Sequence, residues 1–114
     1  MCRLMDQQAL QEQFKDLEYL AADFLEREDF ESAAKCYQHL ILDDPDDARA
    51  YYNLAIVLHD LSMFDESLAC YEQAIKLGYD NIARANLNTG MNYLKMGDFK
   101  RGFYYVDLKS DGAW

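Results

Sequence analysis

The residues of this 114-residue chain that most often carry chemistry are few, and their spacing does not assemble a reactive site. The two histidines, His39 and His59, stand far apart, and the three cysteines (Cys2, Cys36 and Cys70) include no C-x-x-C pair. A zinc site or a disulfide framework would need closer or paired cysteines. No Ser-His-Asp order and no glycine-rich phosphate loop occurs. The sequence therefore predicts a non-enzymatic protein without a metal or cofactor, in a reducing compartment.

The densest group of potential metal ligands is the acidic run Asp43-Asp44-Pro45-Asp46-Asp47. A calcium loop needs a central glycine and a well-placed terminal glutamate, and this run has neither. Proline ends a helix, and aspartates are favoured at the N-terminus of the helix that follows. We interpret the run as a solvated turn between two helices.

Composition places the chain among globular proteins and limits its partners. Hydrophobic residues make up 51% and charged residues 28%, and 11 basic against 21 acidic side chains give a formal net charge of -10. Nucleic acids and anionic membranes recruit basic surfaces, so neither is the expected partner. The strongest apolar stretch, 54–58, is far shorter than a membrane span, and the polar N-terminus has no apolar signal core. We expect a single cytoplasmic domain.

The elements that position these residues are helices arranged in repeats. Apolar residues recur at helical spacing from Leu17 onward without strand-like alternation, so the predicted fold class is all-α. Sliding the sequence by 34 residues places segment 30–47 on segment 64–81. A shift of 35 then places segment 88–103 on segment 53–68. A fixed period of this length is typical of a repeat protein.

The repeats resemble those of the tetratricopeptide (TPR) family, in which large and small residues alternate at fixed places in each helix pair. The matching positions of the middle repeat are Tyr51, Leu54, Ala55, Leu58, Ser67, Tyr71 and Ala74. Those of the first repeat are Leu17, Leu20, Ala21, Phe24, Ala33, Tyr37, Leu40 and Pro45. The third repeat supplies Gly90, Tyr93, Gly97, Asp98 and Phe99 before it degrades. The resemblance covers residues 14 to about 109.

This resemblance implies a TPR α-solenoid of about three antiparallel helix pairs in a right-handed superhelical array. The expected division is a helical lead-in (1–13), two repeats (14–47 and 48–82), and a degraded third repeat with the C-terminal tail (83–114). Small residues on both helices of a pair let the helices approach closely.

In TPR folds the first helix of each pair lines a concave groove, so the resemblance also implies a peptide-binding site. The groove residues that we expect to bind a partner are Lys15, Tyr19, Arg49, Tyr52, Asn53, Ile56, Arg84, Asn88 and Met91. The basic residues form one row that would attract a carboxylate, unless they pair with neighbouring acids. The asparagines would hold a peptide backbone, and the aromatic and aliphatic residues would bury apolar side chains.

One TPR ligand class is not expected. In the carboxylate clamp, which binds the acidic C-termini of cytosolic heat-shock chaperones, Asn53 and Arg84 match two of five positions. Glu18 stands where that clamp has a lysine, and a glutamate repels a ligand carboxylate. We therefore predict that such chaperone tails do not bind.

The predicted function is a protein-interaction module that binds an apolar or amphipathic partner segment, with an acidic group as an optional feature. Two alternatives are a chaperone like the class II chaperones of type III secretion, and a regulatory or truncated part of a glycosyltransferase-type protein. The C-terminal segment, with Phe103, Tyr104, Tyr105 and Trp114, leaves no room for a capping helix. A fragment, a homo-oligomer through this uncapped end, or a covering partner would each explain it.

Overall fold

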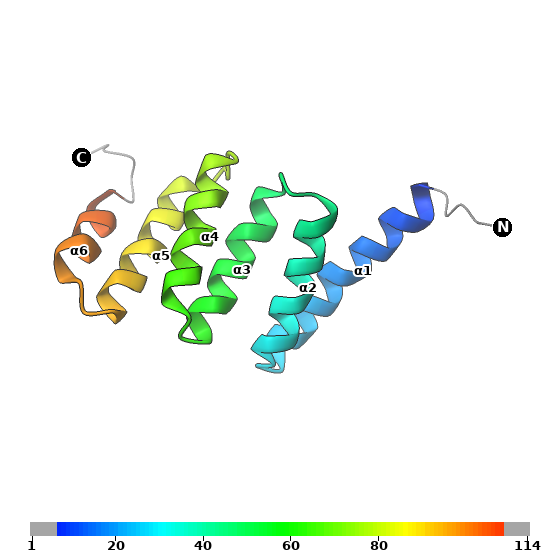
Figure 1. Ribbon diagram of the computed structural model, residues 1–114, viewed down its shortest axis with the longest axis horizontal. Helices are drawn as coiled ribbons and strands as arrows, with labels where there is room; N and C mark the ends of the chain where they lie inside the picture. Colours follow the sequence, from blue (N-terminus) through cyan, green and yellow to red (C-terminus); the bar gives the residue numbers. More distant parts are fainter. Residues whose placement is uncertain (1–6, 109–114) are drawn as a thin grey trace.

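The computed structural model describes the backbone of residues 7–108 and the side chains of residues 16–108. Within this range the chain forms six helices and no strand: α1 (Gln7–Glu26), α2 (Phe30–Asp43), α3 (Ala48–Asp60), α4 (Phe64–Lys76), α5 (Ile82–Lys95) and α6 (Phe99–Asp107). Successive helices run antiparallel and stack along one long axis (Figure 1), and the molecule measures 58 × 29 × 20 Å. The predicted all-α repeat fold is confirmed.

Small residues stand where the two helices of each pair meet. Ala21 of α1 and Ala33 of α2 are fully buried, as are Ala55 of α3 and Ser67 of α4. In the third pair both positions are glycines, and a Cβ on Gly90 would come within 2.8 Å of the carbonyl oxygen of Gly102. The backbones of α5 and α6 therefore approach too closely for alanine, because that contact lies inside the van der Waals limit.

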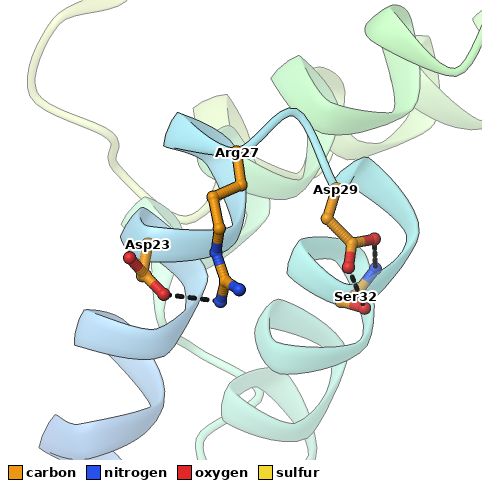
Figure 2. A network of polar contacts seen from close by, with 4 residues as sticks. All are labelled: Asp23, Arg27, Asp29 and Ser32. Carbon is orange, nitrogen blue, oxygen red and sulfur yellow. Dashed lines mark hydrogen bonds and ion pairs between the residues drawn. The ribbon is translucent and has the colours of Figure 1, made fainter.

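Aspartate and asparagine side chains begin most of the helices. Asp29 precedes α2, and its carboxylate accepts hydrogen bonds from the backbone N–H (3.2 Å) and the hydroxyl (2.8 Å) of Ser32, as Figure 2 shows. Directly after α1, Arg27 forms an exposed ion pair with Asp23 of that helix at 2.6 Å. Asn81 and Asp98 cap α5 and α6 in the same way. These caps satisfy backbone donors that a helix N-terminus leaves unpaired.

The acidic run between α2 and α3 forms a turn. The carboxylate of Asp44 accepts a hydrogen bond from the N–H of Asp46 at 3.1 Å. Asp47 is the N-cap of α3, where its carboxylate accepts from the N–H of Ala50 at 3.1 Å. The oxygens of these two aspartates thus serve the backbone of the turn.

The core divides into two clusters of buried side chains along the stack. The larger cluster joins α1, α2 and α3, with Tyr37, Leu40, Leu54, Val57 and Leu58 among its buried members. The second joins α3, α4 and α5 around Tyr52 and Tyr71. No helix in the described part of the chain combines the length and apolar character that crossing a membrane requires.

The last helix leaves large apolar side chains in solvent. Phe99, Phe103 and Tyr104 of α6 are 61%, 60% and 59% exposed. No helix among the described residues follows α6 and covers this face. The C-terminal residues 109–114, which include Trp114, lie outside the described residues.

Candidate interaction groove

The first helices of the three pairs, α1, α3 and α5, frame two hollows. We call the hollow between α1 and α3 the first hollow; its volume is about 190 Å³. Its lining residues are Glu18, Ala22, Tyr37, Leu40, Asp47, Arg49, Ala50 and Asn53. Two carboxylates and one guanidinium group therefore share this small space, and the rest of its wall comes from α1, α2 and α3, with the amide of Asn53 as a further polar group.

The second hollow lies between α3 and α5 and is larger, at about 320 Å³. Its lining residues are Tyr52, Ile56, His59, Tyr71, Arg84, Asn88 and Met91. None of these lining residues is acidic, and Arg84 carries a positive charge, so the formal charge of the lining is positive. This difference in charge separates the two hollows: an anion meets two carboxylates in the first and none in the second.

Tyr52 forms the floor of the second hollow and is part of the core. Only 6% of this residue is exposed. Its ring stacks on Tyr79 at 4.3 Å between centroids and meets Tyr71 edge-on at 5.7 Å. The partner Tyr79 comes from the turn after α4, where Gly78 has a φ of +91° that glycine adopts without strain. The apolar surface that Tyr52 offers to a ligand is therefore small.

Asn88 already has a partner within the protein. Its side-chain amide donates a hydrogen bond to the Tyr52 hydroxyl at 2.9 Å. Burial raises the pKa of Tyr71 far above its ordinary value, the neighbouring Tyr52 adds to the rise, and a hydrogen bond with Asn88 acts against it. Asn88 thus fastens α5 to the tyrosines beneath the second hollow, and its amide N–H would have to leave Tyr52 to donate to a peptide.

The two arginines of the predicted basic row have no ion pair with any described residue. Each instead faces a tyrosine. Burial raises the pKa of Tyr37, Cys36 and Glu18 add to the rise, and Arg49 opposes it. In the same way burial and Tyr79 raise the pKa of Tyr52, and Arg84 opposes the rise. Both guanidinium groups are exposed and available to a ligand anion.

The structure brings seven of the nine predicted groove residues to the two hollows. Arg49 and Asn53 line the first hollow, and the second is lined by Tyr52, Ile56, Arg84, Asn88 and Met91. Tyr19 of α1 is 69% exposed and lines neither hollow. The side chain of Lys15 lies outside the described residues.

Sequence reasoning missed a buried polar chain beneath the second hollow. Asn92 of α5 is fully buried and bonds to His59 of α3 and to Ser67 of α4. The 35-residue offset places Asn92 at the position that Val57, a fully buried apolar residue, occupies one repeat earlier. An amide at an apolar repeat position is the signal that would have revealed these bonds, since a buried amide needs hydrogen-bond partners.

The two cysteines within the described residues offer no reactive thiol. Cys36 and Cys70 are free, and burial raises the pKa of both thiols, to about 11 at Cys70 where Glu66 adds to the effect. A thiol that stays protonated at neutral pH is a poor nucleophile and a poor metal ligand. Among the described residues, no three His, Cys, Asp or Glu side chains lie together as a metal site would require.

Comparison with known proteins identifies the repeat. Tetratricopeptide-repeat family models match residues 48–77 and residues 23–62. No curated protein sequence matches the chain significantly.

Solved structures share its fold. In the TPR2B-domain:pHsp70 complex of yeast Sti1 the matching chain is 24% identical, with a TM-score of 0.77 over 84% of this chain and 76% of that one. The Yersinia enterocolitica type III secretion translocator chaperone SycD is 19% identical, with a TM-score of 0.81 over 88% and 75%. The N-terminal domain of stress-induced protein-1 (STI-1) from C. elegans is 23% identical, with a TM-score of 0.76 over 89% and 84%. At these identities the likeness establishes the fold alone.

Proposed function

Because the chain is a tetratricopeptide-repeat protein, we propose that it is a non-catalytic interaction module that binds a segment of a partner protein across α1, α3 and α5. Structures with this fold include a domain in complex with pHsp70 and a translocator chaperone, which supports a protein partner in general. One observation carries the proposal: two neighbouring hollows on these helices each contain an exposed arginine without an ion pair among the described residues.

The second hollow is the expected anchor of the partner segment. Ile56 and Met91 offer apolar surface there, and Met91 is 44% exposed. Arg84 supplies a guanidinium group that can form two parallel hydrogen bonds with a carboxylate. An apolar side chain next to an acidic group is therefore the ligand feature that fits this hollow. In the first hollow, Asn53 has an amide without a hydrogen-bond partner among the described residues and can hold the peptide backbone.

Binding of acidic chaperone tails is not part of the proposal. Such a tail would place carboxylates near Glu18 and Asp47, which line the first hollow together with the single Arg49. Two fixed carboxylates beside one guanidinium make that space unfavourable for a multiply charged anion. The partner segment expected here carries its acidic group at one end, where it would meet Arg84 of α5.

The proposal is tested with peptides selected from a displayed random-peptide library against the full-length protein. A selected peptide should bind Arg84→Ala and Asn53→Ala about tenfold more weakly than the unchanged protein, because each loses a charged or amide hydrogen bond. Lys35→Ala, an exposed change on α2 away from both hollows, is the matched control and should bind normally. Equal weakening by all three variants, or by none, would contradict binding across α1, α3 and α5.

Two narrower hypotheses from the sequence concern the biological role. A secretion-type chaperone would protect a secreted client, so deletion of the gene would lower the level of one secreted protein. A part of a glycosyltransferase-type protein would instead be accompanied by a catalytic domain in the same reading frame or a neighbouring one. The likeness to SycD is one of fold and does not distinguish between these two hypotheses.

A further inference from the structure

Three helices meet at a chain of hydrogen bonds directly beneath the second hollow. Ser67 of α4 bonds to the carbonyl oxygen of Ala55 on α3 at 2.6 Å. The side-chain nitrogen of Asn92 on α5 bonds to the Ser67 hydroxyl at 2.8 Å, and the side-chain oxygen of Asn92 bonds to Nδ1 of His59. Ser67 and Asn92 are fully buried, whereas His59 is half-buried and lines the hollow.

The chemistry of Ser67 fixes the direction of this chain. A carbonyl oxygen cannot donate, so the short contact with Ala55 needs the single hydroxyl proton of Ser67 between the two oxygens. With that proton committed, the Ser67 oxygen can only accept a hydrogen bond from Asn92. The NH₂ group of Asn92 must therefore face Ser67, and the carbonyl of Asn92 must face His59.

The same logic then fixes the proton on His59. The side-chain carbonyl of Asn92 only accepts, so Nδ1 of His59 must carry a proton and donate it. In the neutral imidazole ring the other nitrogen, Nε2, is then unprotonated and is a hydrogen-bond acceptor. Nε2 has no partner among the described residues. Phe64 of α4 meets the ring edge-on at 5.4 Å between centroids and restricts its rotation.

We propose that His59 is a specificity-determining residue of the second hollow, with Nε2 as a fixed acceptor for a neutral N–H or O–H donor of the partner segment. Asn92 and Ser67 are the positioning residues that set this tautomer. The inference rests on the proposed function, because it concerns what the same hollow selects.

The other residues of the hollow narrow the class of donor. Arg84 lies in the same hollow and repels a Lys or Arg side chain, so the donor is neutral. Ile56 and Met91 favour a donor attached to an apolar group. An indole side chain combines both features, and its N–H has no acceptor character to compete with Nε2. The ligand feature that fits is thus a tryptophan, or another apolar group that carries one neutral donor.

The tautomer is tested first, without any ligand. Long-range ¹H–¹⁵N NMR spectra of the full-length His39→Gln protein report His59 alone, recorded at a pH at which the spectra themselves show the ring to be neutral. The expected result is a protonated Nδ1 and an unprotonated Nε2. In Asn92→Val, which places the residue of the preceding repeat at this position, the ring is free to move its proton to Nε2. A proton on Nε2 of the unchanged protein overturns the proposal.

The specificity is tested with two small probes, indole and 1-methylindole, which share a ring system but differ in the N–H donor. We expect indole to bind the second hollow about 3- to 10-fold more tightly, measured by NMR shifts of the Ile56 and Met91 methyl groups. The preference should disappear in His59→Phe and fall in Asn92→Val, with helical content monitored by circular dichroism. Equal binding of the two probes, or binding of neither, overturns the proposal. Unchanged peptide binding by Arg84→Ala and Asn53→Ala would contradict the proposed function while leaving the free-protein tautomer unaffected.

Discussion

The two contacts between successive repeats are built from equivalent positions but opposite chemistry. Where α2 packs on α3, the buried residues of α3 include Leu54 and Val57 within an apolar cluster. Where α4 packs on α5, the same positions carry Thr89 and Asn92, which are buried and polar. The first contact buries apolar side chains alone at these positions, whereas the second adds hydrogen bonds that specify orientation to the apolar cluster around Tyr71.

The polar contact also packs less completely. A hollow of about 490 Å³ opens between α4, α5 and α6. Asn86 and Thr89 line it from α5, and Leu68 and Ile75 line it from α4. In the α2–α3 contact, Ile41 packs against the apolar cluster at the position equivalent to Ile75. The same backbone repeat thus accepts either an apolar or a hydrogen-bonded interface, and the buried Asn92 amide is accommodated because Ser67 and His59 are its partners.

The largest expected effect comes from placing the polar residue in the apolar contact. Val57→Asn puts an amide into a hydrophobic cluster in which Ala33 stands at the position of Ser67, so the protein loses apolar burial and the new amide lacks the partner that Asn92 has. We expect the free energy of unfolding to fall by about 3 to 4 kcal/mol. Urea unfolding followed by circular dichroism measures it. A loss below about 1 kcal/mol would show that the α2–α3 contact is not apolar in solution.

The next largest effect concerns Ser67. Ser67→Ala removes the acceptor of the buried Asn92 amide, and we expect a loss of about 2 kcal/mol in the free energy of unfolding. Alanine fits this position sterically, because Ala33 occupies it in the first repeat.

A double-mutant cycle separates the hydrogen bond from the packing. In the Asn92→Val background no amide remains to satisfy, so Ser67→Ala should cost at least about 1 kcal/mol less than it does alone. Additive effects would mean that the two side chains do not interact.

A smaller effect is expected for the reciprocal exchange. Asn92→Val removes the amide itself, while Ser67 keeps its hydrogen bond to the carbonyl oxygen of Ala55. We expect the unfolding free energy to change by less than about 1 kcal/mol, because Ser67 keeps its carbonyl partner and the half-buried His59 can form a hydrogen bond with water instead. Thermal unfolding is a sufficient measurement. A loss as large as that of Val57→Asn would show that the contact depends on its hydrogen bonds.

The smallest expected effect is a pH dependence at Cys70, which packs against both core clusters. Burial raises the pKa of this thiol from 9.0 to about 11, with a further contribution from Glu66. Between these values the unfolded chain has lost the proton that the folded chain still holds, so stability falls as the pH rises through this range.

The buried tyrosines also have raised pKa values and lose stability at alkaline pH in the same way. The contribution of Cys70 is therefore measured as the difference between the unchanged protein and a variant without the thiol. Cys70→Ala should lose less stability between pH 9.0 and about 11 than the unchanged protein does, measured by urea midpoints at both ends of the range. An equal loss of stability in the two proteins would show that the Cys70 thiol is exposed to solvent in the folded state.

Much of the fold followed from the sequence because the repeat is a local pattern. Small residues at fixed places, such as Ala55 and Gly90, identify where the two helices of a pair touch. These contacts can be predicted from one repeat without reference to its neighbours. Most predicted groove residues reached the two hollows for the same reason: equivalent positions on first helices share one face. The boundaries of the three repeats and the roles of the groove residues remain predictions.

What the tertiary structure alone decided is which partner each polar side chain takes. Asn88 donates to Tyr52, and Tyr52 stacks on Tyr79 from the following turn, so two expected ligand contacts also hold the core. His59 and Asn92 are 33 residues apart, and only the packing of α3 on α5 joins them. Spacing in the sequence fixes the face of a helix on which a side chain lies. A hydrogen bond depends on the distance between donor and acceptor to within a fraction of an ångström. Side-chain packing between helices sets that distance only once the chain has folded.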